Sequence, residues 1–296
     1  MRRFISLALL VTLLAAAPSA APVRFDVDCV DQLMDFHGDP ARADLVVFIG
    51  GNEWFAVPKL VAAFQRIHPE VKNVYYETLP PGLLAEQMSA GALQVGGLVI
   101  SVKPDVYIAG KKRMDKEVAD GLVGRPVVFA TNVLGIMVKK GNPKRIAGVA
   151  DLGRDDVRVA MPNPKTEGIA RQIEIAYRKA GGDELNHKIM VTKLHNGTTL
   201  MTQIHHRQTP MWILDGKADA GPVWISEALY QQQVGSGLIA IRIPQAKNVT
   251  ALYLASVVHN APHPKAAEAF KQFLTSPTAQ AIYRSYGFGA PASTEE

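Results

Sequence analysis

The hydrophobic pattern is clearest in residues 44–66, where a continuous apolar run gives way to a periodic one. Residues 45–49 are apolar and rich in β-branched side chains, which is typical of a strand covered on both faces. Gly50 and Gly51 permit a tight turn, and Asn52 stands at the N-cap position of the next helix. That helix is predicted from apolar residues at helical spacing, namely Phe55, Leu60, Ala63 and Phe64.

The same alternation of strand and helix recurs along the chain. Further strands are predicted at residues 71–77, 105–109, 157–160 and 249–258, and helices at 83–90, 169–180 and from 264 onward. Residues 92–102 are apolar and rich in glycine, so we expect a loop or a small ribbon there. Residues 127–138 are too long for an ordinary strand, and polar Thr131 and Asn132 interrupt them, which favours a crossing between two domains. The pattern predicts an α/β protein with doubly wound sheets.

The N-terminus has the pattern of a secretory signal. Arg2 and Arg3 precede an apolar run, and small residues follow up to Ala21. We therefore predict a cleaved signal peptide at residues 1–21 and a periplasmic mature protein, because the run is too short for a membrane span. Residues 22–43 are predicted to form an N-terminal arm with an extra strand, for which the sequence indicates no function.

Composition and motifs narrow the function. The chain has 296 residues, 48% of them hydrophobic, enough for two domains. Removing Arg2 and Arg3 reduces the 32 basic residues to 30 against 27 acidic ones, a net charge of +3 that does not favour nucleic acid. Cys29 is the only cysteine, so no disulfide forms within the chain. No motif of a serine hydrolase, a P-loop or a zinc protease is present, so we expect no catalytic residues, no metal and no cofactor.

Three predicted turns share one property. Residues 50–54, 78–82 and 162–168 each place a helix N-terminus after the carboxyl end of a strand. In open α/β sheets, ligands bind at that edge, and helix N-termini carry partial positive charge that suits an anion. Each turn alone is equally compatible with an ordinary connection in an α/β domain.

Taken in order, several segments resemble the periplasmic solute-binding proteins of ABC transporters, in the branch that binds molybdate, tungstate and sulfate. The segments are residues 48–64, 83–87, 105–109, 138–143, 219–224 and 263–288. The resemblance implies a type II periplasmic-binding-protein fold, with two lobes that are each a mixed sheet flanked by helices and a two-strand hinge. Lobe 1 would comprise residues 44–129 and 259–296, and lobe 2 residues 130–258. It further implies a non-catalytic, monomeric protein that delivers a small anionic ligand to a membrane permease.

The resemblance also points to ligand contacts. Where molybdate-binding relatives use serines, this chain has Asn52 in the first loop and Pro80 and Pro81 before the second helix, and Trp224 replaces a tyrosine. Donors remain at Thr78, Thr166 and the backbone of Gly82. From the resemblance we expect the ligand to be a tetrahedral oxyanion such as molybdate, tungstate or sulfate, or a small carboxylate or phosphorylated metabolite.

Residues 202–210 have no counterpart in the simplest relatives. Arg207 offers a planar fork for a carboxylate, sulfate or phosphate, and His206 can add a donor. Glu53 and Glu167 would repel an anion unless its hydroxyl groups donate to them. The alternative to a transport protein is an exported hydrolase or a metal-binding protein that uses His205 and His206. The complete set of candidate contacts is Asn52, Glu53, Thr78, Gly82, Thr166, Glu167, His206, Arg207 and Trp224.

Overall fold

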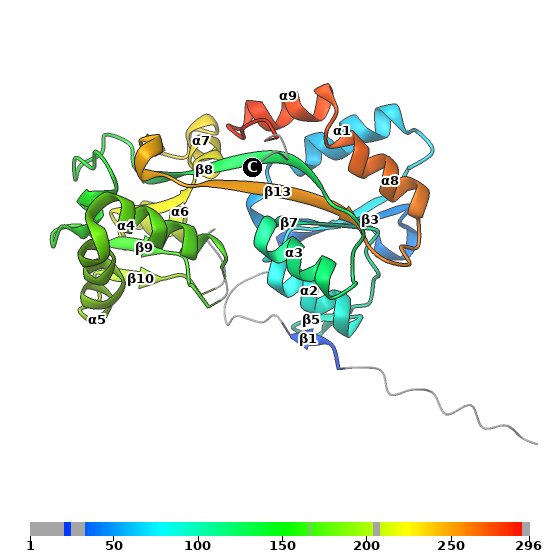
Figure 1. Cartoon of the computed structure of the whole chain (residues 1–296), viewed down its shortest axis with the longest axis horizontal. Helices are drawn as coiled ribbons and strands as arrows, with labels where there is room; N and C mark the ends of the chain where they lie inside the picture. The colour runs from blue at the N-terminus through cyan, green and yellow to red at the C-terminus, as the bar shows by residue number, and fades with distance from the viewer. Residues whose placement is uncertain (1–20, 25–32, 166, 204–207, 292–296) are drawn as a thin grey trace, which may run out of the picture.

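The computed structural model describes residues 21–24, 33–165, 167–203 and 208–291. Within these residues the chain forms two α/β bodies, which two long strands connect, β8 (Val127–Lys139) and β13 (Thr250–Val257) (Figure 1). We call the body that contains the first strands and the last helices lobe 1, and the other body lobe 2. The predicted α/β class, with mixed sheets flanked by helices, is confirmed.

Lobe 1 is a sheet with helices on both faces. Its strands are β2 (Phe36–His37), β3 (Leu45–Phe48), β4 (Val74–Glu77) and β7 (Val106–Gly110), and its helices are α1 (Val57–Ile67), α2 (Pro81–Ala90), α3 (Lys111–Ala119), α8 (Pro264–Phe273) and α9 (Pro277–Ser285). Leu45 and Val47 of β3 belong to the core under α1, α8 and α9, whereas Val46 and Phe48 belong to the core under α2 and α3. This alternation confirms the prediction of a strand buried on both faces.

Lobe 2 also combines short strands with helices. They are β9 (Val159–Met161), β10 (Thr199–Met201), β11 (Ala220–Trp224) and β12 (Leu238–Arg242), and the helices are α4 (Ile169–His187), α5 (Lys193–His195), α6 (Gln208–Leu214) and α7 (Ile225–Gln233). The helix predicted at residues 169–180 ends at Gly181 and Gly182, whose backbone angles are not helical, and α4 resumes beyond them. Ile173 and Tyr177 of α4 are buried in the core of this lobe.

The register of the two crossing strands shows how the lobes are oriented. The strand order is β10-β9-β11-β8-β13-β7-β3-β4-β2, and β12 also pairs with β8. β13 enters lobe 1 from lobe 2 and places Tyr253 opposite Gly110, the last residue of β7. β3 and β4 run parallel to β7, so all three strands end on the side of lobe 1 that faces lobe 2. In the same way, β8 places Leu134 opposite Trp224, so β11 and its parallel neighbour β9 end on the side that faces lobe 1.

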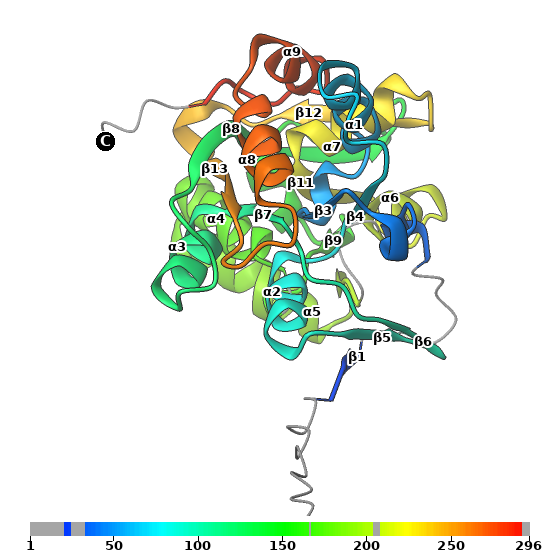
Figure 2. The ribbon, with the colours of Figure 1, turned by 90° about the vertical axis from the view of Figure 1, so that its right-hand side faces the viewer.

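The N-terminal arm and the glycine-rich insertion form additional strands. β1 (Val23–Arg24) pairs with β5 (Leu93–Val95), which pairs with β6 (Leu98–Ile100), so the insertion at residues 92–102 is a ribbon. Figure 2 shows this ribbon projecting from lobe 1. The predicted signal peptide lies almost entirely outside the described residues. No helix in the described part of the chain is long and apolar enough to cross a membrane.

Candidate functional site

The candidate site lies where the strand ends of the two lobes face each other. In lobe 1, β3 leads into the turn Gly51–Glu53, β4 leads into Thr78, and β7 leads directly into α3. In lobe 2, β9 leads into residues 162–168 and β11 leads directly into α7. Helices therefore begin on both facing edges, and their N-termini direct partial positive charge into the space between the lobes.

A chain of hydrogen bonds connects these edges through both crossing strands. The Asn52 side-chain amide donates to the Tyr253 hydroxyl on β13 (2.5 Å). The Asn132 side chain on β8 is a second partner of that hydroxyl, and its amide donates to the Ser226 hydroxyl at the start of α7 (2.8 Å). Burial raises the pKa of Tyr253 well above its usual value, so the hydroxyl stays protonated. The predicted donor Asn52 is thus coupled to the strands that join the lobes.

Glu53, the residue after Asn52, is completely buried and lies against α9. One carboxyl oxygen accepts a hydrogen bond from the Tyr283 hydroxyl (2.8 Å), and the other has no hydrogen-bond partner among the described residues. Burial raises the pKa of Glu53 to about 8, although the bond from Tyr283 opposes this effect. At neutral pH the side chain is therefore a neutral carboxylic acid, and it places no negative charge beside the first loop.

Thr78 and Gly82 lie on either side of the loop after β4. The Thr78 hydroxyl donates to the Asp35 carboxylate (3.0 Å), and the Thr78 amide donates to the Asp35 carbonyl (2.9 Å). Gly82 is the second residue of α2. A Cβ atom at this position would lie 3.0 Å from Nη2 of Arg113, so the glycine leaves space for the arginine at the start of α2.

The edge of lobe 2 also contains a buried carboxylate. Glu167 accepts hydrogen bonds from the Thr202 hydroxyl and from the Asn163 amide (3.2 Å). Trp224, the last residue of β11, is 7% exposed and packs edge-on against Tyr253, with ring centroids 6.1 Å apart. Trp224 therefore lies where β11 meets the crossing strands, next to the hydrogen-bonded chain.

Three predicted contacts, Thr166, His206 and Arg207, lie outside the described residues, as does His205. Their positions in the site remain predictions. Among the residues that the structure describes, no group of three or more histidine, cysteine, aspartate or glutamate side chains could hold a metal ion.

Arg113 is a candidate contact that the sequence reasoning missed. Its side chain is 39% exposed and pairs with the buried carboxylate of Glu117 (3.3 Å), while Nη2 lies near Gly82. Arg113 follows Lys111 and Lys112, so three cations occupy the first turn of α3. Positive side chains are unfavourable at a helix N-terminus, so Arg113 in the first turn of α3 was itself a signal of a binding role.

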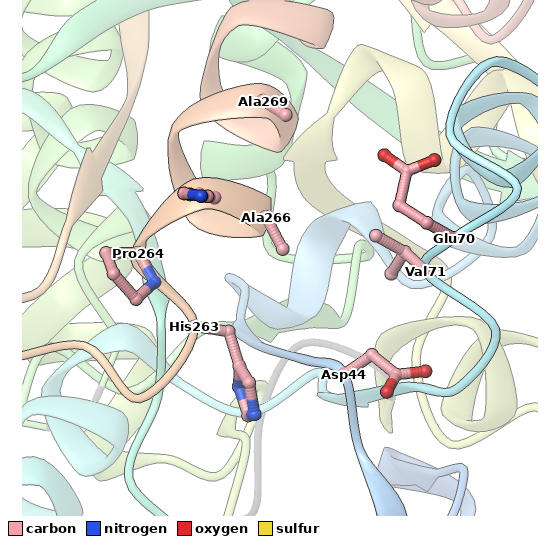
Figure 3. Close-up of a pocket in the computed structure, with 8 residues that line it drawn as sticks. Asp44, Glu70, Val71, His263, Pro264, Ala266 and Ala269 are labelled. Atoms are coloured by element: carbon pink, nitrogen blue, oxygen red, sulfur yellow. The ribbon is translucent and has the colours of Figure 1, made fainter.

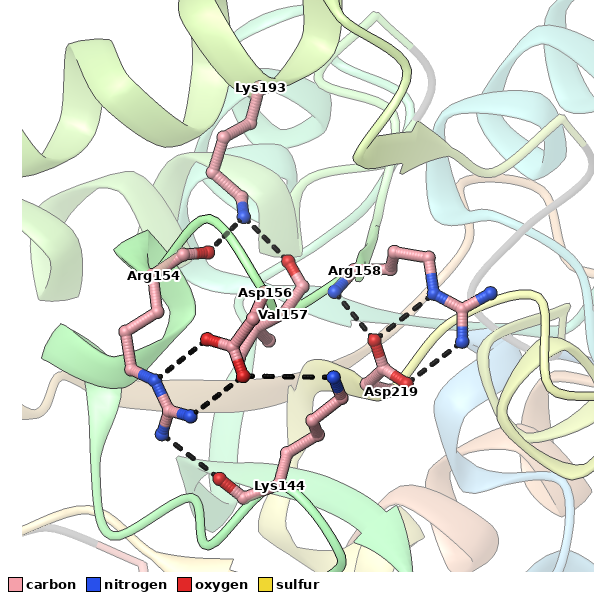
Figure 4. A network of polar contacts seen from close by, with 7 residues as sticks. All are labelled: Lys144, Arg154, Asp156, Val157, Arg158, Lys193 and Asp219. Carbon is pink, nitrogen blue, oxygen red and sulfur yellow. Dashed lines mark hydrogen bonds and ion pairs between the residues drawn. The ribbon is translucent and has the colours of Figure 1, made fainter.

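Two other regions lie at the opposite ends of the strands. A cavity of about 510 Å³ in lobe 1 is lined by Asp44, immediately before β3, and by His263, whose ring bonds the buried carboxylate of Asp105 (3.0 Å) (Figure 3). In lobe 2, Arg158 and Asp219 form a two-bond ion pair before β9 and β11 (Figure 4). Neither region faces the other lobe, so we do not assign them to the site.

Comparison with known proteins gives consistent results. The family model described as bacterial extracellular solute-binding protein matches residues 45–289. Molybdate-binding protein ModA from Mycobacterium tuberculosis is 29% identical over 250 residues, which cover 80% of this chain and 84% of that protein. A sulfate-binding protein from Escherichia coli is 29% identical over 188 residues, covering 59% of this chain and 56% of that protein. The periplasmic molybdate-binding protein of Azotobacter vinelandii has a similar fold, with a TM-score of 0.66 and 16% identity over 84% of this chain and all of its own.

Proposed function

Because this chain belongs to the bacterial extracellular solute-binding proteins, of the molybdate- and sulfate-binding type, we propose that it captures a small anion between the facing edges of its lobes. It then delivers the anion to the membrane permease of an ABC transporter. The relatives are binding proteins without catalytic activity, so the chain performs no reaction on its ligand. Export through the signal peptide at residues 1–21, a periplasmic location and a monomeric state are parts of the same proposal.

One observation carries this proposal: the parallel strands of both lobes end on facing edges, and helices begin there. Each helix N-terminus contributes roughly half a positive charge, so opposed helices can stabilise an anion with few cationic side chains. The hydrogen bonds from Asn52 through Tyr253 and Asn132 to Ser226 cross from one lobe to the other. A ligand that contacts Asn52 would therefore act on the same polar chain that joins the lobes.

The ligand is a tetrahedral oxyanion, such as molybdate, tungstate or sulfate, or a small carboxylate or phosphorylated metabolite. Asn52, Gly82 and Trp224 lie at the ends of strands or the starts of helices and are proposed contacts. Arg113 adds a guanidinium group beside the N-terminus of α2, and its side chain is partly exposed to solvent. Guanidinium groups bind carboxylate, sulfate and phosphate oxygens through two parallel hydrogen bonds, which suits each of these ligands.

A thermal-shift panel on the mature protein tests the proposal. The panel contains molybdate, tungstate, sulfate, phosphate, small carboxylates and sugar phosphates. A ligand at a hundred times its dissociation constant stabilises the folded state by about 2.7 kcal/mol, which raises the melting temperature by roughly 5–10 °C.

For the anion that gives the largest shift, Arg113→Gln should weaken binding at least about tenfold. Lys112 is an exposed cation on the same helical turn as Arg113. Lys112→Gln removes the same charge, so it is the matched control and should retain the affinity. The absence of a shift with every anion would contradict the proposal.

A further inference from the structure

The N-terminal arm brings a buried carboxylate to the site. The arm, residues 22–43, includes η1 (Leu33–Asp35) and β2, and it precedes residue 45, where the match to the family model begins. β2 pairs antiparallel with β4, with Phe36 opposite Glu77 and His37 opposite Tyr76. The His37 ring also stacks on Tyr76, with centroids 4.5 Å apart. These contacts hold Asp35 beside the end of β4.

Asp35 occupies donors that an anion could otherwise use. Asp35 is 1% exposed, and its carboxylate accepts a hydrogen bond from the Thr78 hydroxyl, while its backbone carbonyl accepts one from the Thr78 amide. The loop that begins at Thr78 contacts the first loop of lobe 1, because the Gly51 amide donates to the Leu79 carbonyl (3.0 Å). The carboxylate therefore lies at the same facing edge as Asn52.

A second carboxylate has an equivalent position in lobe 2. Glu167 accepts hydrogen bonds from the Thr202 hydroxyl and the Asn163 amide, at the ends of β10 and β9. On both edges, the hydroxyl of the threonine that follows a strand thus donates to a carboxylate of the same chain, and in lobe 2 a backbone amide does so as well. A fully ionised anion at either edge would meet a negative acceptor where it needs a donor.

We propose that Asp35 is a specificity-determining residue that selects ligands carrying a hydrogen-bond donor, such as a protonated oxyanion or a hydroxy acid. The inference rests on the proposed function and narrows its ligand class. A ligand hydroxyl can donate to the carboxylate, and this charge-assisted bond offsets the loss of water from both groups. An ion without a proton cannot make the bond, and the negative charges repel each other at close range. Selection therefore arises as much from rejection of the wrong ion as from attraction of the right one.

Phosphate and sulfate form the sharpest pair of probes. Both are tetrahedral and similar in size, but phosphate retains at least one proton at neutral pH and sulfate has none. Glycolate and acetate form a second pair, which differs by one hydroxyl group. In calorimetric titrations at pH 7, the wild-type protein should bind the donor-carrying member of a pair at least about tenfold more tightly.

Substitution of Asp35 tests its role directly. Asp35→Asn removes the charge, while the amide oxygen can still accept from Thr78 and hold the arm in place. This variant should lower the ratio of phosphate to sulfate affinity at least about tenfold. Asp39→Asn, in the exposed part of the same arm, is the matched control and should leave the ratio unchanged. Thr78→Val removes the internal donor from Asp35 and should raise the ratio, which provides an independent variant if Asp35→Asn does not fold.

The outcomes distinguish this inference from the proposed function. If wild-type protein binds sulfate or molybdate as tightly as phosphate, and Asp35→Asn changes all three affinities equally, the inference is wrong while the transport proposal stands. If none of the anions binds the wild-type protein, the transport proposal is wrong and the inference falls with it. If Asp39→Asn abolishes the phosphate preference as fully as Asp35→Asn does, the preference arises from the net charge of the arm. This result would also refute the role of Asp35.

Discussion

Glu53 should make the stability of this protein depend on pH, and glutamine at this position should remove that dependence. The side chain is completely buried, and only one of its oxygens has a hydrogen-bond partner among the described residues. Burial raises the pKa of Glu53 from 4.5 to about 8. The folded protein therefore retains a proton that the unfolded chain releases above about pH 4.5.

The magnitude follows from linkage between proton binding and folding. From pH 4.5 to about 8, the folded state holds one more proton than the unfolded state, so stability falls as pH rises. This window spans roughly 3.5 pH units at about 1.4 kcal/mol each, so the free energy of unfolding should fall by about 5 kcal/mol. Below the window both states are protonated, and above it both are ionised, so Glu53 contributes no further slope.

Urea denaturation of wild-type protein and Glu53→Gln between pH 4.5 and 9 would measure the effect. Glutamine does not titrate, and its oxygen can still accept the bond from Tyr283. The free energy of unfolding of the variant minus that of wild type should therefore rise by about 5 kcal/mol between pH 4.5 and 9. This rise does not depend on how the two proteins differ in stability at low pH. Burial also raises the pKa of Glu77, to about 7, but that contribution is common to both proteins and cancels in the comparison. Glu86→Gln, at an exposed position of α2, is the control and should follow the wild-type curve.

A parallel pair of curves would refute this reasoning. If wild type and Glu53→Gln lose stability equally between pH 4.5 and 9, Glu53 is ionised in the folded protein at neutral pH. The first loop would then carry a buried negative charge, which would oppose the binding of an anion beside it.

Two further predictions concern the polar network of lobe 2 (Figure 4). The buried ammonium group of Lys193 donates to two backbone carbonyls, each at 2.5 Å, so Lys193→Met should reduce the free energy of unfolding by about 2–3 kcal/mol in urea titrations. Lys188, whose side chain is 42% exposed, provides the control, and an equal effect of Lys188→Met would contradict the assignment. Burial by itself would raise the pKa of Asp219, but hydrogen bonds from Arg158 hold this pKa below its usual value. The stability that the Arg158–Asp219 pair contributes is therefore present above about pH 4 and is lost as pH falls. Asp219→Asn should cost about 1–2 kcal/mol at pH 7 and progressively less as pH falls below about 4, unlike the exposed control Asp215→Asn.

Local patterns in the sequence predicted many of the strands and helices in their order along the chain. Residues 45–49 predict a buried strand because every side chain is apolar, and β3 is buried along its whole length. The polar break at Thr131 and Asn132 indicated a crossing strand, and β8 connects the two lobes through these residues. Short β10 and β12 were not predicted, because three to five residues carry too little periodicity to distinguish a strand from a loop.

Which side chains meet depends on how the whole chain folds. Asn52 and Tyr253 are 201 positions apart, Glu53 and Tyr283 are 230 apart, and Asp35 and Thr78 are 43 apart. Each pair depends on the register of strands and helices that fold against each other over long distances, and no local pattern records that register. A strand or a turn follows from the preferences of a few neighbouring residues, whereas a raised pKa or an occupied donor depends on what the rest of the chain places beside it.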